Sequence, residues 1–180
     1  MSKIQDYLAT NPPIRETVIG YLIRGNEVLL GIRTRVSNDL GHHVIAGIGG
    51  GVEAGETLEE ALKREIHEEI EVDITEYQKV GRVVNLSPHR PAWNMRVMIY
   101  LVAAFEGEPK KTVDIDPRWY LKAELPLPEM WSDNQITAPL ALAGKRIAGS
   151  FLYSANGQIA EQWLTELTAD EAIPEIIGQL

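Results

Sequence analysis

The chain has 180 residues, no cysteine, 44% hydrophobic and 24% charged residues, and a formal charge of −9. This length suits one domain over residues 1–180, and the composition is that of a folded protein rather than a disordered one. The lack of cysteine excludes disulfides and thiolate chemistry, and the longest apolar run (97–105) is too short to cross a bilayer. Because the chain is acidic and has no apolar signal segment at its start, we expect a cytoplasmic protein with neither a membrane nor a nucleic-acid polymer as partner.

Short β-rich runs dominate the chain and surround one strong helical segment. In chain order we expect a lead-in segment at 1–13, strands at 17–23 and 27–32, a glycine-rich loop at 41–51, a helix at 58–70, strands at 80–86, 95–105 and 119–121, a short helix at 134–143, strands at 150–154 and 158–164, and an acidic helix or tail at 168–180. Asp116-Pro117 indicates a loop before the strand expected at 119–121, and Asn156-Gly157 indicates a hairpin turn. The pattern favours an α+β fold with a mixed sheet.

The helix at 58–70 has the clearest start signal in the chain. Thr57 precedes it and Glu60 follows three residues later, which is the spacing of a capping box. The segment up to residue 70 has no Gly or Pro, and its apolar residues recur at helical spacing.

Two thirds of the net charge lies in residues 53–71, where eight glutamates and two cations give −6. Glu65, Glu68 and Glu69 are spaced i, i+3 and i+4, so their carboxylates lie on one face of the helix and repel one another. Hard oxygen ligands in this number suit Mg²⁺ or Mn²⁺ bound beside a polyphosphate. A solvated acidic face is the alternative that the spacing alone leaves open.

Three common motifs of phosphate and metal sites are absent from this region. Glu56 stands where a P-loop has its lysine, and Val52 where a dinucleotide-binding loop has its last glycine. Glu71 stands where a zinc peptidase has its second histidine. The glycines and glutamates of this region therefore match none of these three motifs.

The pattern that they form is Gly50-x5-Glu56-x7-Arg64-Glu65-Ile66-x-Glu68-Glu69-x-Glu71-Val72. It resembles the signature of the Nudix hydrolases, G-x5-E-x7-R-E-U-x-E-E-x-G-U, in which U is aliphatic, and only Glu71 departs from it. The resemblance implies a Nudix fold, an α/β/α sandwich with a mixed sheet between helices and a loop–helix–loop catalytic motif. It also implies hydrolysis of a diphosphate bond in a nucleoside diphosphate linked to another group.

The resemblance also implies roles for single residues. The implied catalytic residues are Arg64, Glu65, Glu68 and Glu69, and the implied ligands of Mg²⁺ or Mn²⁺ are Gly49, Glu65, Glu68 and Glu69. Arg64 is implied to pair with Glu56 or a neighbour and to orient the carboxylates. Because the family glycine often ends the helix in a left-handed conformation, which Glu71 adopts at a cost of about 1 kcal/mol, the turn there is open to change.

A second resemblance covers more of the chain. The segments Asp114-Ile-Asp116-Pro117-Arg118-Trp119, Met130-Trp131-Ser132-Asp133 and Gly149-Ser-Phe-Leu-Tyr153 are similar to the MutT-homologue branch, which hydrolyses oxidised purine nucleoside triphosphates to the monophosphate and pyrophosphate. It implies that Trp131 stacks on the base and that Asp114 lies near the metal site. Asp133 and Asn134 are implied to read the purine edge, with Asn134 in place of an Asp of the branch and Ala46 in place of an Asn. We expect Asp133 to accept from ring N–H groups and Asn134 to donate to a carbonyl.

Other functions stay open at this point. The same chemistry would serve an ADP-ribose or nucleotide-sugar pyrophosphatase, and a non-catalytic nucleotide-binding or regulatory module would share the fold. The intact pairs Arg64-Glu65 and Glu68-Glu69 argue against the latter. A homodimer is also open, and Arg33 and Arg35 are further candidates for contact with phosphate.

Overall fold

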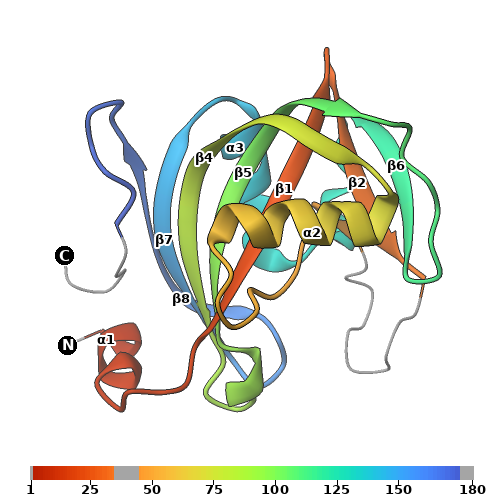
Figure 1. Cartoon of the computed structure of the whole chain (residues 1–180). Coiled ribbons are helices and arrows are strands. Elements are labelled where there is room, and N and C mark those ends of the chain that lie inside the picture. The colour runs from red at the N-terminus through yellow and green to blue at the C-terminus, as the bar shows by residue number, and fades with distance from the viewer. Residues whose placement is uncertain (1, 35–44, 175–180) are drawn as a thin grey trace.

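The computed structural model describes residues 2–34 and 45–174, and its centre is one eight-stranded sheet (Figure 1). In chain order the elements are α1 (Lys3–Leu8), β1 (Arg15–Arg24), β2 (Glu27–Arg33), β3 (Ile45–Ala46), α2 (Leu58–Ile70), β4 (Asp73–Leu86), the 3₁₀ turn η1 (Pro91–Trp93), β5 (Met95–Glu106), β6 (Ile115–Leu121), the 3₁₀ turn η2 (Leu127–Glu129), α3 (Ser132–Leu142), β7 (Arg146–Tyr153) and β8 (Ile159–Leu167). None of the helices in these ranges is long and apolar enough to cross a membrane.

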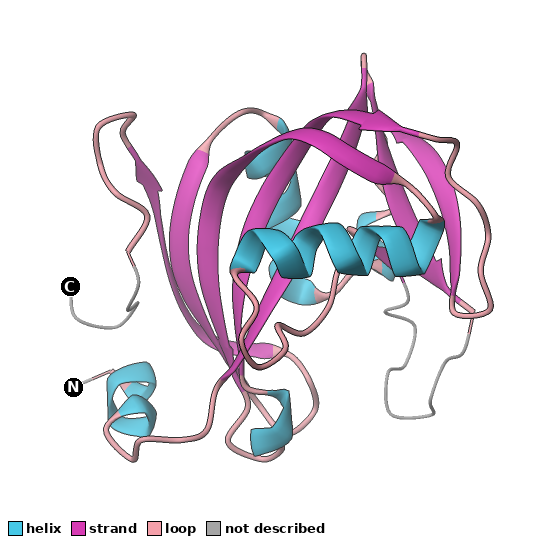
Figure 2. Ribbon diagram, viewed as in Figure 1, coloured by secondary structure: helices cyan, strands magenta, loops and turns pink. Residues whose placement is uncertain are grey.

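The sheet is mixed, as the sequence predicts. Its strand order is β3-β2-β1-β5-β4-β7-β8, and β6 pairs with β2 outside this path. The pairs β1–β5 and β4–β7 are parallel, and the remaining pairs are antiparallel. The long apolar strand β5 is central, with β1 on one side and β4 on the other (Figure 2).

The two longer helices cover opposite faces of the sheet, with α2 in front and α3 behind in the view of Figure 1. Successive residues of β1 point to opposite faces, as the pleat requires. Leu22 packs in one apolar cluster with Ile66 of α2. Tyr21 packs in a second cluster with Ala138 and Ala141 of α3. The sheet therefore lies between helices, which is the layer arrangement that the sequence predicts.

The predicted helix at 58–70 is confirmed residue for residue. The side chain of Thr57 accepts from the backbone N–H of Glu60, and the Glu60 carboxylate accepts from the N–H of Thr57, which completes the capping box. At the other end Glu71 takes the left-handed conformation, with φ 57° and ψ 40°. The helix thus ends as it would with glycine, and Glu71 pairs with Lys110 at 2.6 Å.

One expectation was wrong. Asp116 and Pro117 lie within β6 and not in a loop. Proline is tolerated there because β6 pairs only with β2 among the described strands, so the missing N–H faces no second neighbour. The described part of the acidic C-terminal segment, residues 168–174, contains no helix.

The N-terminal lead-in segment holds a helix that the composition did not predict. In α1, Ile4 is buried in a cluster with Leu86 of β4 and Leu152 of β7. The backbone N–H groups of Lys3 and Ile4 donate to the carboxylate of Glu161 on β8. This segment is therefore packed against the last two strands.

Candidate active site

The glycine-rich loop that precedes α2 runs beside β1. The N–H of Val18 donates to the carbonyl of Gly50 at 2.9 Å, and the N–H of Gly20 donates to Ile48 at 2.7 Å. Gly49 has φ 155°, and a Cβ there would lie 2.1 Å from the carbonyl oxygen of Val18. Only glycine fits this position, so the backbone of the loop is held close to the sheet.

Arg64 of α2 joins this loop to the carboxylates of the helix. Its Nε and Nη2 donate to the two oxygens of Glu56 at 2.6 and 2.9 Å, and Nη2 also donates to the carbonyl of Gly51. Its Nη1 donates to Glu65 at 2.9 Å and to Glu68 at 3.3 Å. Through this bidentate pair, the pKa of Glu56 falls to about 2 and that of Arg64 rises.

Glu69 is held differently, against the loop backbone. Its Oε2 accepts from the N–H of Gly49 at 3.1 Å. Burial raises its pKa to about 7, and the negative charges of Glu65 and Asp114 act in the same direction, while Gly49 and Arg33 oppose them. Asp114 is therefore close enough to Glu69 to influence its ionisation, as the sequence implies.

The donor atoms of the glutamates and of the glycine loop are of the kind that binds a divalent cation. Within the described residues no three His, Cys, Asp or Glu side chains form a ready-made metal cluster, and Glu65 and Glu68 are instead engaged by Arg64. Yet Glu65 reaches the loop so closely that a Cβ on Gly50 would lie 2.4 Å from its Oε2. Three carboxylates and a loop carbonyl are the hard oxygen donors that Mg²⁺ and Mn²⁺ prefer.

A cleft of about 850 Å³ lies against the glycine loop. It is lined by Gly49 and by three residues that the sequence analysis assigns to base binding, Trp131, Asp133 and Asn134. The described lining contains none of the α2 glutamates. The backbone of the loop therefore contacts both the carboxylates and the cleft.

Asp133 is the most constrained side chain of the cleft. It is 4% exposed, and its two oxygens accept from the amide of Asn85 at 2.8 Å and from the hydroxyl of Tyr153 at 2.7 Å. Burial raises its pKa, against the effect of these hydrogen bonds. The backbone N–H groups of Asn134 and of Asp133 itself act on this carboxylate in the same direction as Asn85 and Tyr153, so its orientation is fixed.

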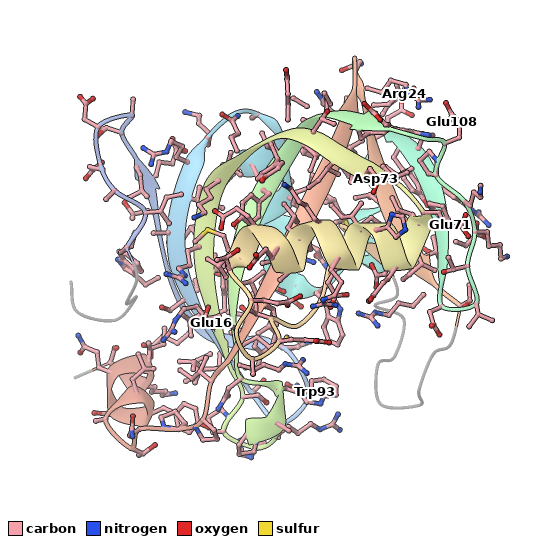
Figure 3. All side chains as sticks on the ribbon, in the orientation of Figure 1. Glu16, Arg24, Glu71, Asp73, Trp93 and Glu108 are labelled. Atoms are coloured by element: carbon pink, nitrogen blue, oxygen red, sulfur yellow. The ribbon has the colours of Figure 1, made fainter. Side chains whose placement is uncertain are left out.

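Trp131 forms an aromatic corner with a residue that the sequence analysis did not single out. The rings of Trp93 in η1 and Trp131 are 5.8 Å apart at 89°, an edge-to-face contact. The guanidinium group of Arg90 lies over the ring of Trp93, 4.8 Å from its centroid. Trp93, labelled in Figure 3, lies in the loop between β4 and β5 and also lines the cleft.

Comparison with known proteins decides the family. Residues 13–140, more than half of the chain, match the model of the NUDIX domain. The chain belongs to the Nudix family. Oxidized purine nucleoside triphosphate hydrolases from Danio rerio and Mus musculus are 31% and 29% identical to this Nudix protein, over 81% of it and 91% of each relative. The crystal structure of a MutT protein from Bacillus halodurans has the same fold, with a TM-score of 0.72 at 20% identity over 84% of this chain and 97% of that one.

The expectation of an enzyme that hydrolyses the diphosphate linkage of a nucleotide is thus confirmed at the level of the Nudix family. The structure brings the residues expected from the Nudix signature and from the MutT-homologue branch into two neighbouring groups. Arg64, Glu56, Glu65, Glu68, Glu69 and Asp114 lie on the helix side of the loop, and Trp131, Asp133 and Asn134 lie in the cleft. Gly49 belongs to both groups.

The sequence analysis assigned no role to some residues of the cleft of this Nudix hydrolase. Asn85, Trp93 and Tyr153 come from three different elements, and no local pattern links them. In the sequence, Trp93 is marked only by its position after a proline-flanked loop, which does not indicate a role in binding. Arg33 lines the cleft, whereas Arg35 lies outside the described residues.

Proposed function

We propose that this Nudix hydrolase cleaves purine nucleoside triphosphates, oxidised purines included, to the monophosphate and pyrophosphate with Mg²⁺ as cofactor. The observation that supports this substrate is the cleft, in which Trp131, Asp133 and Asn134 meet the loop that contacts the glutamates. Two relatives that cover most of the chain carry the name of oxidized purine nucleoside triphosphate hydrolase, which agrees with it.

Glu65, Glu68, Glu69 and the carbonyl of Gly49 would hold the metal. When bound, Mg²⁺ would neutralise phosphate charge and make water a better nucleophile. Arg64 positions two of these carboxylates through its ion pairs with Glu65 and Glu68. The carboxylates take the proton from the attacking water, and the glycine loop lets the phosphates approach the backbone closely.

In the cleft the base would stack on the ring of Trp131, since base–aromatic stacking contributes about 1–3 kcal/mol. Asp133 accepts from ring N–H groups, and its orientation is fixed by Asn85 and Tyr153. The amide of Asn134 donates to a ring carbonyl. This arrangement of acceptor and donor fits the edge of a 6-oxopurine better than that of a pyrimidine.

We also propose that residues 1–180 form one catalytic domain, because α1 and β8 at its two ends pack on the same sheet. The charge concentrated at the metal ligands, rather than spread over a basic face, favours free nucleotides over a nucleic-acid polymer as substrate. A cytoplasmic location agrees with such a substrate, and a homodimer is compatible with it.

Product analysis over a nucleotide panel tests the reaction. The wild-type protein is incubated with Mg²⁺ and with dGTP, 8-oxo-dGTP, dCTP or ADP-ribose, and pyrophosphate and phosphate are quantified separately. We expect monophosphate and pyrophosphate from the purine triphosphates, no turnover without a divalent metal, and a loss of about 10²-fold or more in Glu68→Gln. Equal turnover by that variant, or turnover of ADP-ribose alone, would contradict the proposal.

Base recognition is tested by Asp133→Ala and Asn134→Ala. Each removes one partner of the purine edge, so the ratio of kcat/KM for purine over pyrimidine triphosphates should fall by about tenfold or more. An unchanged ratio in both variants would show that these side chains do not read the base.

A further inference from the structure

The sheet side of the base-binding cleft contains one buried amide. Asn85 is on β4, two residues after Val83, so both side chains point to the same face of the sheet. Val83 packs in one apolar cluster with residues of α3, which lies behind the sheet in Figure 1. Asn85 pairs with Met95 of β5 and with Phe151 of β7, and it lines the cleft. It is therefore a polar side chain between two apolar neighbours at the cleft.

The orientation of this amide is fixed by Asp133. The Nδ2 of Asn85 donates to Oδ2 of Asp133 at 2.8 Å, and the other carboxylate oxygen accepts from the hydroxyl of Tyr153 at 2.7 Å. A carboxylate only accepts hydrogen bonds, so the NH₂ group of Asn85 faces Asp133 and its oxygen points away from Asp133.

The oxygen of the same amide lacks a donor. The Oδ1 of Asn85 is buried and has no hydrogen-bond partner among the described residues, and Asn85 as a whole is 7% exposed. Its neighbours Met95 and Phe151 carry no side-chain donor. A buried acceptor without a donor is rare and unfavourable in a folded protein. Because Asn85 lines the cleft, a ligand bound there is in a position to supply this donor.

The position of Asn85 beside Asp133 indicates which donor this is. The assignment rests on the proposed function, in which Asp133 accepts from a ring N–H and Asn134 donates to a ring carbonyl. Asp133 lies between the other two residues, since Asn134 follows it in α3 and Asn85 is hydrogen-bonded to it. Together they present a donor, an acceptor and a second acceptor. The edge of guanine presents the complementary series of a carbonyl, a ring N–H and an amino group.

We propose that Asn85 determines the specificity for the exocyclic amino group at position 2 of the base, so that guanine nucleotides are preferred over hypoxanthine nucleotides. Hypoxanthine has the same carbonyl and ring N–H as guanine and lacks only this amino group. When it binds, the Oδ1 of Asn85 stays buried without a donor. A site discriminates most strongly against a ligand that leaves its buried polar groups unpaired in this way.

Tyr153 allows this role to be separated from a structural one. Both Asn85 and Tyr153 donate to Asp133, but only Asn85 has an acceptor without a partner at the cleft. Loss of a donor to Asp133 affects guanine and hypoxanthine alike, because both present the ring N–H that Asp133 accepts from. Loss of the Asn85 oxygen affects guanine alone.

Steady-state kinetics with dGTP and dITP in Mg²⁺ test the proposal. For the wild type we expect kcat/KM to be at least about tenfold higher for dGTP, since dITP leaves one buried acceptor unpaired. In Asn85→Leu, which is close to asparagine in size, this ratio should fall to within about twofold of one. Asn85→Ala is the second variant in case the leucine variant does not fold, and the wild-type ratio itself needs no variant.

Tyr153→Phe is the matched control. It removes one donor to Asp133 and leaves the Asn85 oxygen in place, so kcat/KM should fall for both nucleotides while their ratio stays within about twofold of the wild-type value. If Tyr153→Phe and Asn85→Leu change the ratio equally, Asn85 acts only by holding Asp133, and the proposal is overturned.

Calorimetric titration with dGMP and dIMP in EDTA measures base recognition without metal or turnover. We expect tighter binding of dGMP by the wild type and loss of this preference in Asn85→Leu. If no triphosphate is hydrolysed but dGMP binds more tightly than dIMP, the proposed reaction is wrong and the role of Asn85 stands. Equal treatment of guanine and hypoxanthine by the wild type in both assays, or neither binding nor turnover with either base, would overturn it.

Discussion

Gly50 is the position at which the glycine loop leaves room for the carboxylate of Glu65, one of the proposed catalytic residues. A Cβ there would lie 2.4 and 2.7 Å from the two oxygens of Glu65, whereas ordinary carbon–oxygen contacts begin near about 3.3 Å. Gly50→Ala must therefore displace the Glu65 carboxylate by about 1 Å. The added Cβ is the only change, because Gly50 has no positive φ and its backbone conformation suits alanine as well.

The expected effect is on activity and not on stability. A displacement of about 1 Å at a catalytic group costs about 10²-fold in rate, so kcat/KM for the preferred nucleotide should fall by about that factor. The displaced group is the mobile end of a side chain, and alanine restricts the unfolded chain. The free energy of unfolding should therefore stay within about 1 kcal/mol of the wild type. Steady-state kinetics and urea unfolding of the same preparation measure the two effects.

Gly51→Ala is the matched control. A Cβ on Gly51 meets no atom within 4 Å, and this glycine also has no positive φ. We expect its kcat/KM to remain within about threefold of the wild type, since no carboxylate has to move. Full activity of Gly50→Ala, or an equal loss in both variants, would refute the reasoning.

Three further variants test other parts of the structure. Thr57→Ala removes the N-cap of α2 and should lower the free energy of unfolding in urea by about 1 kcal/mol; an unchanged value would mean that the cap is dispensable. Glu56→Gln removes a carboxylate whose pKa is lowered from 4.5 to about 2, so its stabilisation is complete above the ordinary pKa and is lost as pH falls through the folded one. The difference in unfolding free energy between wild type and Glu56→Gln should thus shrink between pH 4.5 and pH 2, and a constant difference would argue against the Arg64 pair as its source. Trp93→Ala should raise the nucleotide KM by up to about tenfold with little change in kcat, because it removes the edge contact that holds Trp131; Trp93→Phe should restore most of it, and equal values for both would assign Trp93 to packing alone.

The sequence predicted the parts of the fold that local signals determine. The helix at 58–70 has a capping box, apolar periodicity and no breaker, and each signal acts within four residues. The strand β4 begins at Asp73, seven residues before the predicted start. The prediction missed this first half because its residues are mostly exposed and polar. Pro117 misled the prediction because proline argues against a strand only where both edges are paired.

The same distinction holds for the candidate site. The carboxylates and Arg64 lie on one helix and the loop before it, so their spacing was sufficient to predict which of them meet. The cleft is assembled from side chains distant in sequence, and Asn85 meets Asp133 only because α3 packs beside the end of β4. No pattern within one element could have predicted that contact.

Arg64 explains how the acidic segment is stable before a metal binds. Three glutamates of this segment, Glu56, Glu65 and Glu68, accept hydrogen bonds from this one guanidinium group. A metal that takes Glu65 and Glu68 must compete with Arg64 for both. Glu56 has the shortest contact and the bidentate geometry, so it can retain Arg64 when the other two carboxylates turn to the cation. The positive charge of Arg64 would then lie beside the proposed metal ligands and limit the net negative charge that a polyphosphate meets.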